Sequence, residues 1–298
     1  MHGNNTKEIV KSNSLIQASY TLGLTEIRVI LLSIIEARKN EILISSDTFL
    51  EVSAELYAKE FSVTRQAAYM ALSEAVTTLF QRQVTIFGID KKTKKKEKRV
   101  IRWVSGISYV EDAGLIKLRF SPEVISEITN LKENFTQYKL AQIAGLYSAY
   151  AVRLYEIVMQ WQSKGKTPFF ELGKFRELLG IAPEEYSAMC DFKKRVLDLS
   201  VKQINEKTNL NLSYTQKKSG RVVTHFSFEF SLKEDSSTTK KEPKILGVPK
   251  SEIEKKARKG ESYEQAAARI KAKLKNKKSS KERASSEIES MKKILETA

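Results

Sequence analysis

The sequence predicts the same order of elements twice, three helices followed by a β-hairpin, and few folds contain such a repeat. In the first half, apolar residues at helical spacing predict a helix capped by Thr25, a second from Asp47 to Tyr57, and a third from the cap Thr64 to Phe80. The strands predicted after them are Val84–Ile89, Val100–Tyr109 and Leu115–Phe120. This is the order of a winged helix.

The second half repeats the plan with little identity of sequence. The predicted helices are residues 140–163, Leu172–Leu179 and Met189–Lys207, and the predicted strands are Leu210–Thr215 and Val222–Phe230. Aligning EIRVI (26–30) with AVRLY (151–155) places Arg28 on Arg153. We therefore predict an α+β protein of two tandem winged-helix domains related by pseudo-twofold symmetry, followed by a basic, largely disordered or helical C-terminal tail.

Changes in composition set the expected domain boundaries. They are an N-terminal arm (1–14), a first winged helix (15–135), a second winged helix (136–235), and the tail (236–298). The tail has 18 Lys+Arg against 9 Asp+Glu and few large apolar residues, which is typical of a solvated arm. Its segment 262–275 has helical spacing, so it could form a basic helix on DNA or a partner, or a helix that forms only transiently in solution.

The net charge of +16 predicts a polyanionic partner, and nucleic acid is the leading class. No apolar run reaches the roughly 20 residues that a membrane-spanning helix needs. The first residues lack the apolar block of a secretory signal, and the single Cys190 cannot form an internal disulfide. We therefore expect a cytoplasmic protein that binds no membrane.

The predicted helix Met189–Lys207 has the properties of a recognition helix. At 100° per residue, one face presents Asp191, Lys194, Arg195, Asp198, Lys202 and Asn205, and the opposite face places Phe192, Val196 and Leu199 in the core. An ordinary charged surface would show the same pattern. The hairpin beyond it favours DNA contact, because Lys217, Lys218 and Arg221 surround the turn at Ser219-Gly220 as a phosphate-binding wing would require.

The corresponding helix of the first half, Thr64–Phe80, carries little charge. Ala68, Leu72, Ala75 and Leu79 are expected inward, and Gln66, Met70, Ser73 and Thr77 outward. Arg65, Gln66 and Tyr69 near its start are candidate base contacts, although a plain polar surface explains them equally well. The loop at 91–99 contains Lys94, Lys95 and Lys96; it is either a mobile solvated tip or a phosphate contact, and its expected place in a wing favours the second.

No catalytic constellation is found in the sequence. The only histidines, His2 and His225, do not form the His-apolar-His pair of a DNA-nicking initiator, and with one cysteine they exclude a zinc site of Cys/His type. We expect no enzyme activity, no metal and no cofactor.

Two segments carry a resemblance to a known family. VKSNSLIQASYTLGLTEIRVILLSI (Val10–Ile34) and the helix and wing block Asp191–Phe230 are similar to the iteron-binding replication initiators of theta-replicating plasmids. The resemblance spans roughly Val10–Lys233. It departs from the family at Met189-Cys190, where a bulkier aromatic residue is expected.

The resemblance implies a mechanism. Monomers would bind double-stranded DNA at direct repeats of the origin, melt nearby A+T-rich DNA, and recruit the host initiator and the replicative helicase. A homodimer in equilibrium with the monomer, formed through the first domain, would repress the protein's own gene, and chaperones would shift dimer to monomer. The DNA contacts that the resemblance implies are Lys193, Lys194, Arg195, Lys202 and Arg221.

Two alternatives remain open from the sequence. One is a winged-helix transcription regulator without a replication role, and the other is a structural or partner-binding protein with a basic tail. Direct repeats beside the gene, spaced by about two helical turns, would favour the initiator.

Overall fold

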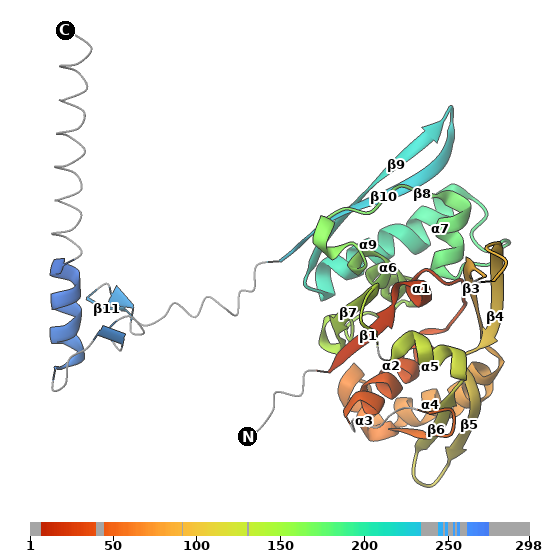
Figure 1. The fold of residues 1–298 in the computed structure, drawn as a ribbon, viewed down its shortest axis with the longest axis horizontal. Coiled ribbons are helices and arrows are strands. Elements are labelled where there is room, and N and C mark those ends of the chain that lie inside the picture. The colour runs from red at the N-terminus through yellow and green to blue at the C-terminus, as the bar shows by residue number, and fades with distance from the viewer. Residues whose placement is uncertain are drawn as a thin grey trace. The chain divides into compact units, whose positions relative to one another are not determined.

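The computed structural model describes residues 7–39, 45–90, 92–129, 131–233, 244–246, 248–249, 253, 255–256 and 261–273. The chain divides into two compact units, Met1–Lys233 and Glu234–Ala298. Within the described residues, no helix is long and apolar enough to span a membrane. Figure 1 shows the elements of the larger unit, with the two hairpins β3–β4 and β9–β10 extending from its body.

The first winged helix runs from α2 to β6. Its helices are α2 (Leu24–Lys39), α3 (Ala54–Phe61) and α4 (Arg65–Gln81), and its strands are β2 (Leu50–Ser53), β3 (Gln83–Ile89), β4 (Lys96–Arg102), β5 (Val104–Val110) and β6 (Leu115–Phe120). Thr64 accepts a hydrogen bond from the backbone N–H of Ala67, which confirms it as the cap of α4. The short helix α5 (Pro122–Ile128) follows β6.

The second winged helix runs from α6 to β10. Its elements are α6 (Ala149–Met159), β8 (Phe170–Glu171), α7 (Leu172–Leu179), α8 (Met189–Asp191), the π-helical segment η3 (Phe192–Leu197), α9 (Asp198–Lys207), β9 (Leu210–Ser219) and β10 (Val222–Leu232). Short 3₁₀ turns lie at η1 (Leu140–Gln142) and η2 (Gln162–Lys164). The predicted bounds of α7 are confirmed, and so is the run of helix from Met189 to Lys207.

Sheet topology identifies the wing of each domain. The strand order is β2-β6-β5 in the first domain and β8-β10-β9 in the second, and both sheets are antiparallel. The counterpart of the hairpin β9–β10 is therefore β5–β6, and β3–β4 is an additional hairpin inserted between α4 and β5. The expectation that the lysine-rich loop occupies the wing position was wrong, because the strand expected from Val100 to Tyr109 is split at Trp103 into β4 and β5.

Three other expectations differ from the structure for local reasons. Thr25 lies inside α2, whose start is held by Glu26 accepting a hydrogen bond from the N–H of Gly23 (2.6 Å). Ser53, not Asp47, caps the second helix, because the residues before it pair as β2. The helix expected over 140–163 is limited to α6 and two short 3₁₀ turns.

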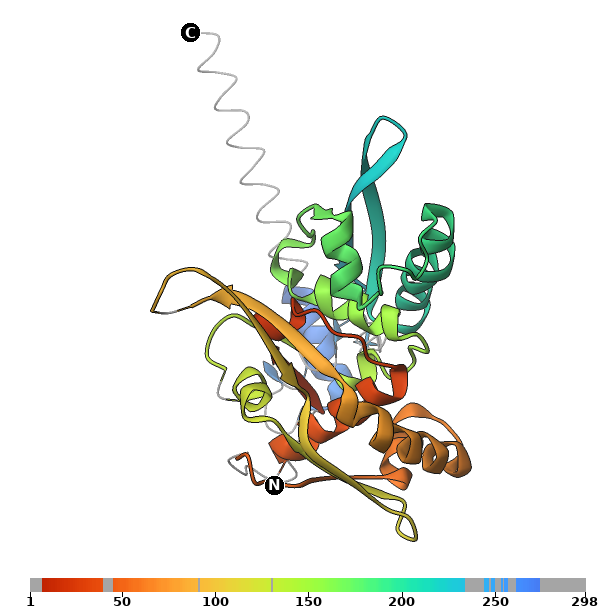
Figure 2. The same cartoon turned by 90° about the vertical axis from the view of Figure 1, so that its right-hand side faces the viewer.

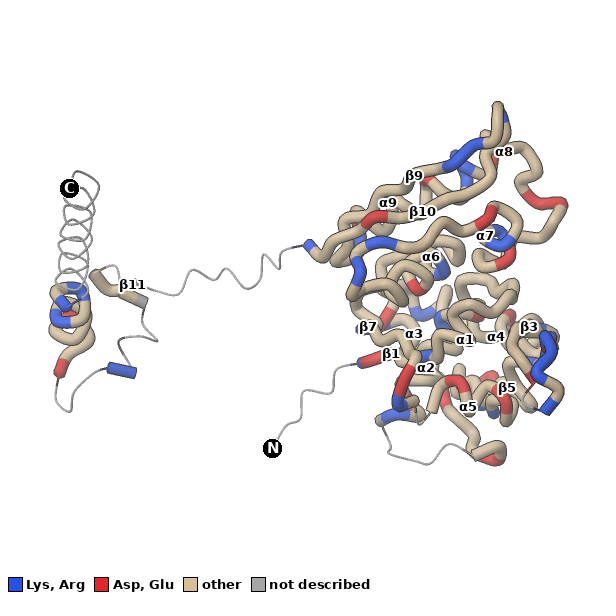
Figure 3. The backbone as a smooth tube through the Cα atoms, turned by 45° about the horizontal axis from the view of Figure 1, so that its top comes forward, with Lys and Arg blue, Asp and Glu red and all other residues tan. Residues whose placement is uncertain are grey.

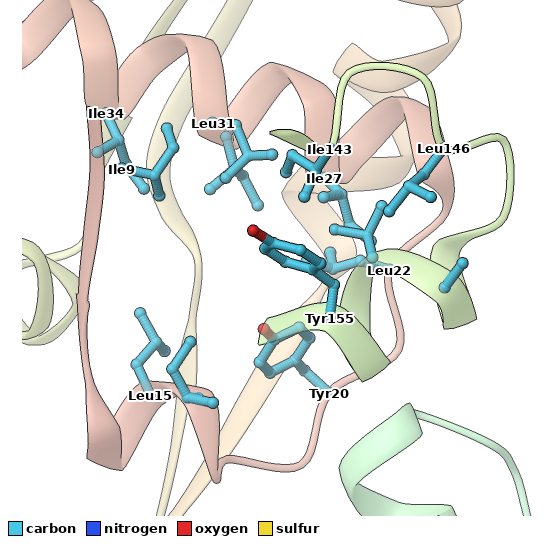
Figure 4. Packing of buried hydrophobic residues seen from close by; sticks show 14 of the residues in the cluster. Ile9, Leu15, Tyr20, Leu22, Ile27, Leu31, Ile34, Ile143, Leu146 and Tyr155 are labelled. Carbon is cyan, nitrogen blue, oxygen red and sulfur yellow. The ribbon is translucent and has the colours of Figure 1, made fainter. Parts of the chain in front are cut away.

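The segment expected as an N-terminal arm contains a strand. Residues Glu8–Ser12 form β1, which pairs antiparallel with β7 (Phe135–Lys139). Ile9 and Val10 are buried there, and α1 (Asn13–Ile16) buries Leu15 and Ile16 directly afterwards. The core of the larger unit is one continuous cluster to which both winged helices contribute; Figure 4 shows its central part, where Tyr20, Ile27 and Leu31 face Tyr155.

The C-terminal unit has a small core of its own. Strands β11 (Lys244–Ile245) and β12 (Val248–Pro249) pair antiparallel, and residues 263–273 are helical, which confirms the helix predicted over 262–275 for the part that is described. Buried residues from both parts form the cluster Val248, Ile253, Ala266, Ala267 and Ile270. This packing differs from the solvated arm expected from the sequence; the cluster combines two alanines with three β-branched side chains.

Candidate nucleic-acid interface

The recognition helix of the second domain is one continuous helix with a π-helical turn. Phe192, Val196 and Leu197 of the segment η3 are buried, whereas Leu199 is half-buried. The expected core position Leu199 is thus replaced by Leu197, because a π turn contains more residues than an α turn and rotates the following face. Its ends remain regular, and Ile204 packs in the core of the domain.

The opposite face of this helix presents cations to solvent. Lys194, Arg195 and Lys202 are exposed and Lys193 is half-buried. Arg195 Nε lies 3.4 Å from Asp191 Oδ1, and both side chains are largely exposed, so this ion pair is weak and can be exchanged for a phosphate or a base. The buried face of this helix packs against the domain core, and its exposed Lys and Arg side chains are free to reach a groove of DNA.

The wing β9–β10 continues the basic surface. Lys217, Lys218 and Arg221 are exposed around its two-residue turn, as predicted. Figure 3 shows Lys and Arg in blue along β9 and at the end of this hairpin. The hairpin extends well beyond the body of the domain, which is clearest in Figure 2.

Two contacts that the sequence analysis missed fix this wing. The hydroxyl of Tyr214 on β9 donates to Asp198 Oδ1 of α9 at 2.7 Å, and burial together with that carboxylate raises the pKa of Tyr214 to about 12. The hydroxyl therefore stays protonated at neutral pH and joins wing to helix. Lys217 Nζ lies 4.0 Å from the ring centre of Phe169, a cation–π contact between β9 and the residue that precedes β8. Neither pair has a spacing that a single sequence reveals.

Asn205 has a different environment from the other predicted contacts. Its amide donates to the carbonyl of Leu212 (2.8 Å), and its Oδ1 accepts from the N–H of Leu212 (2.6 Å). Both ends of the side chain are thus occupied in joining α9 to β9. These bonds favour a structural role for Asn205 over the DNA contact that its position on the helix predicts.

In the first domain, α4 has the faces that its sequence predicts. Ala68, Leu72, Ala75 and Leu79 are buried, and Gln66, Met70, Ser73 and Thr77 are exposed. Near its start, Arg65 Nη2 donates to the hydroxyl of Tyr69 (3.3 Å), and the Tyr69 ring lies against Gly114 in the β5–β6 turn. A Cβ on Gly114 would approach the ring to 2.4 Å, so only glycine permits this contact.

The wing of the first domain is acidic where that of the second is basic. Its turn contains Glu111 and Asp112, which would repel phosphate. The exposed lysines Lys94, Lys95 and Lys96 lie instead at the end of the inserted hairpin β3–β4. Asp90 orders their loop by accepting hydrogen bonds from the N–H and the hydroxyl of Thr93, both at 2.6 Å, and these bonds lower the pKa of Asp90.

The inserted hairpin lies beside the second domain. Lys174 Nζ on α7 is 4.4 Å from the ring centre of Phe87 on β3. This contact places β3 against α7, the helix that precedes the recognition helix. Among the described residues, no group of three or more His, Cys, Asp or Glu could hold a metal ion.

Two family models match the chain in sequence. The model described as "Initiator Replication protein, WH1" matches residues 8–159, and the model described as "Initiator Rep protein, WH2" matches residues 171–230. The chain belongs to the initiator replication protein family. The matched WH2 region of this initiator holds the basic recognition helix and wing described above.

The chain is also similar to individual proteins. The initiator has the fold of the Pi initiator protein, solved in complex with iteron DNA, with a TM-score of 0.62, 22% identity, and coverage of 78% of this chain and 100% of that one. It is 26% identical over 228 residues to an uncharacterised 27.6 kDa protein of Escherichia coli, covering 72% of this chain and 92% of that protein. A replication-protein WH1 domain isolated from a multiple sclerosis patient is 41% identical, with a TM-score of 0.34, covering 40% of this chain and 88% of that one.

Proposed function

We propose that this initiator starts plasmid replication by binding directly repeated DNA at the origin, mainly through the recognition helix and wing of its second domain. The observation that carries the proposal is the joint exposure of Lys194, Arg195 and Lys202 on the helix and of Lys217, Lys218 and Arg221 on the wing, within the region matched by the family model. The Pi initiator protein, which shares the fold, was solved with iteron DNA, and that supports the same class of DNA site here.

We divide the chain into an N-terminal segment at 1–14, the first domain at 15–135, the second at 136–235 and the tail from 236. The first domain would contribute backbone contact through Lys94, Lys95 and Lys96 of the inserted hairpin, with Arg65, Gln66 and Tyr69 of α4 as secondary contacts. The proposal includes three further steps. The initiator recruits the host initiator and helicase, its dimer represses its own gene, and chaperones control the balance between dimer and monomer. The chain acts by binding and not by catalysis.

Replacing Arg195 by alanine should weaken binding to the cognate repeat by about 1–3 kcal/mol, or roughly 5- to 150-fold in Kd. Its side chain is exposed and contributes only a weak ion pair to the fold, so the melting temperature should stay within about 2 °C of wild type. Fluorescence anisotropy with a labelled single repeat measures the change. Lys139→Ala, which removes one exposed charge on β7, is the matched control and should bind like wild type. Equal affinities for the two variants would remove Arg195 from the contacts.

Removing Ser236–Ala298 should weaken binding to every DNA sequence while preserving the preference for the cognate repeat. The deleted segment holds +9 of the net charge, because it contains 18 Lys+Arg and 9 Asp+Glu. Fewer released counterions should make the slope of log K against log salt shallower. Binding isotherms at several salt concentrations, with cognate and scrambled DNA, test this. Loss of the preference together with the tail would place base recognition outside the second domain.

A replication assay separates an initiator from a transcription regulator. A plasmid that contains this gene and its flanking repeats, and no other origin, should transform a permissive host. Deleting the repeats should abolish transformation. Substituting flanking DNA outside the repeats, with the promoter left intact, should not. Repression of the gene's promoter without any transformants would favour the regulator.

A further inference from the structure

Arg28 and Arg153 occupy equivalent positions, each the fifth residue of the first helix of its domain, α2 (Leu24–Lys39) and α6 (Ala149–Met159). Each helix is preceded by a connecting segment, here called the first leader (13–23) and the second leader (140–148). Neither arginine lies on the helix and wing surface of the second domain: Arg153 is buried and Arg28 is half-buried, and each faces the other domain.

Each arginine binds the leader of the opposite domain. Arg28 Nη2 donates to the carbonyl of Leu146 in the second leader at 3.1 Å. Arg153 Nη2 donates to the carbonyls of Ile16 and Ala18 in the first leader, at 3.0 and 3.2 Å. The contact is reciprocal, which a chance pair of surface arginines would not produce.

Arg153 is the more constrained of the two. It is 2% exposed, its guanidinium carbon lies 4.0 Å from the ring centre of Tyr20, and its Nη1 donates to the hydroxyl of that residue. Its Nε and Nη2 also donate to the carbonyl of Leu178 at the end of α7, at 3.1 and 2.8 Å. One planar guanidinium thus joins the first leader to the helix that precedes the recognition helix, a geometry that lysine cannot reproduce.

A close backbone contact fixes the same junction. Gly180, at φ +75° after α7, lies so near the first leader that a Cβ would be 2.3 Å from the carbonyl oxygen of Tyr20. Thr21 Oγ1 donates to the carbonyl of Gly180 at 3.1 Å. Any rotation of one domain against the other must break these contacts as well as those of the arginines.

We propose that Arg28 and Arg153 are positioning residues that hold the two winged helices at one spacing, so that the lysine-rich end of β3–β4 extends the DNA surface of the second domain. The contact of Phe87 with Lys174 on α7 is where the hairpin meets that domain. The extension of the DNA surface rests on the proposed DNA-binding function. The fixed spacing of the two domains does not depend on DNA.

A distance measurement without DNA tests the junction. The chain has a single cysteine, Cys190, which is exposed in the second domain, and Ser73→Cys adds a second label site on the exposed face of α4. Double electron–electron resonance between spin labels at these two sites should give one narrow distance distribution. Arg28→Gln and Arg153→Lys should broaden it, whereas Arg82→Gln, which breaks an ion pair with Glu26 inside the first domain, should not. An unchanged distribution in both variants would overturn the proposal.

DNA binding tests the consequence. Neutralising the hairpin with Lys94→Gln, Lys95→Gln and Lys96→Gln should make the salt slope shallower by about 2–3, since each lost phosphate contact removes about 0.9. Arg28→Gln should produce a similar loss, and combining it with the three lysine substitutions should add nothing. Additive losses would contradict the positioning role. If Arg153→Lys does not fold, Gly180→Ala provides a second perturbation of the junction. A wild type that shows no sequence preference, yet keeps a narrow distance distribution, would refute only the proposed function.

Discussion

Replacing Glu156 by glutamine should lower the free energy of unfolding by about 3–5 kcal/mol, the cost typical of breaking a buried ion pair. Glu156 is 1% exposed and accepts from Lys11 Nζ at 2.7 Å, Tyr138 Oη at 2.5 Å and Arg153 Nη1 at 3.1 Å. Without the carboxylate, the ammonium of Lys11, itself 2% exposed, stays buried without a counter-ion. Urea unfolding followed by circular dichroism measures the change.

Glu229→Gln is the matched control for this experiment. Glu229 pairs with Lys166 at a similar distance, 2.6 Å, but both side chains are about half exposed. The same substitution should therefore cost less than about 1 kcal/mol. Equal losses in the free energy of unfolding for the two variants would show that burial does not increase the contribution of the Lys11–Glu156 pair to stability.

Acidification should reduce the difference between Glu156→Gln and wild type. Burial alone would raise the pKa of Glu156, but the charges of Lys11 and Arg153 outweigh it and hold the pKa below its ordinary 4.5. A carboxyl whose pKa is depressed by folding stabilises the protein above its ordinary pKa, and that stabilisation is lost as the pH falls through the folded value. Repeating the urea titrations between pH 7 and pH 3 tests this. A difference that grows on acidification would contradict the assigned charge state.

Replacing Phe192 by alanine should cost about 3–5 kcal/mol, as expected for a fully buried aromatic ring. Phe192 begins the π-helical segment, and its ring lies 6.2 Å from that of Phe175 and 5.9 Å from that of Phe226, centre to centre. The loss should also loosen the recognition helix, because this ring fixes its start against the core. Thermal unfolding and cognate-DNA binding below the melting temperature measure the two effects.

The control for the Phe192 variant is Phe49→Ala, since Phe49 is 51% exposed just before β2. Its removal should change the free energy of unfolding by no more than about 1 kcal/mol. A small effect of Phe192→Ala, comparable with this control, would mean that other contacts anchor the recognition helix.

Local patterns predicted much of the second domain. The bounds of α7, the buried Phe192 and Val196, and the exposed Lys194, Arg195 and Lys202 all follow from helical periodicity and from capping. The error at Leu199 has a physical cause, because a π turn depends on packing against the domain core and leaves no mark in the hydrophobic period.

Contacts between residues far apart in the chain determine the features that the sequence did not predict. The sequence predicted the wing of the first domain at the basic hairpin β3–β4, whereas in the structure the wing is the acidic hairpin β5–β6. The strand break at Trp103 separates the two hairpins, and the pairing of β6 with β2 identifies β5–β6 as the wing. The double hydrogen bond of Asn205 with Leu212 likewise depends on how α9 meets β9. The equivalence of Arg28 and Arg153 was visible in the alignment of the two halves, but their contacts with opposite leaders were not.

We propose that this initiator binds directly repeated DNA in a sequence-specific way. The most direct test is a titration of the purified full-length protein against DNA flanking its own gene and against scrambled DNA of equal length, at moderate salt. We expect a preference of at least about 1,000-fold for the flanking repeats, within the usual range for specific DNA-binding proteins, with one protein bound per repeat. Equal binding to both DNAs would contradict it and leave a basic protein with only nonspecific affinity.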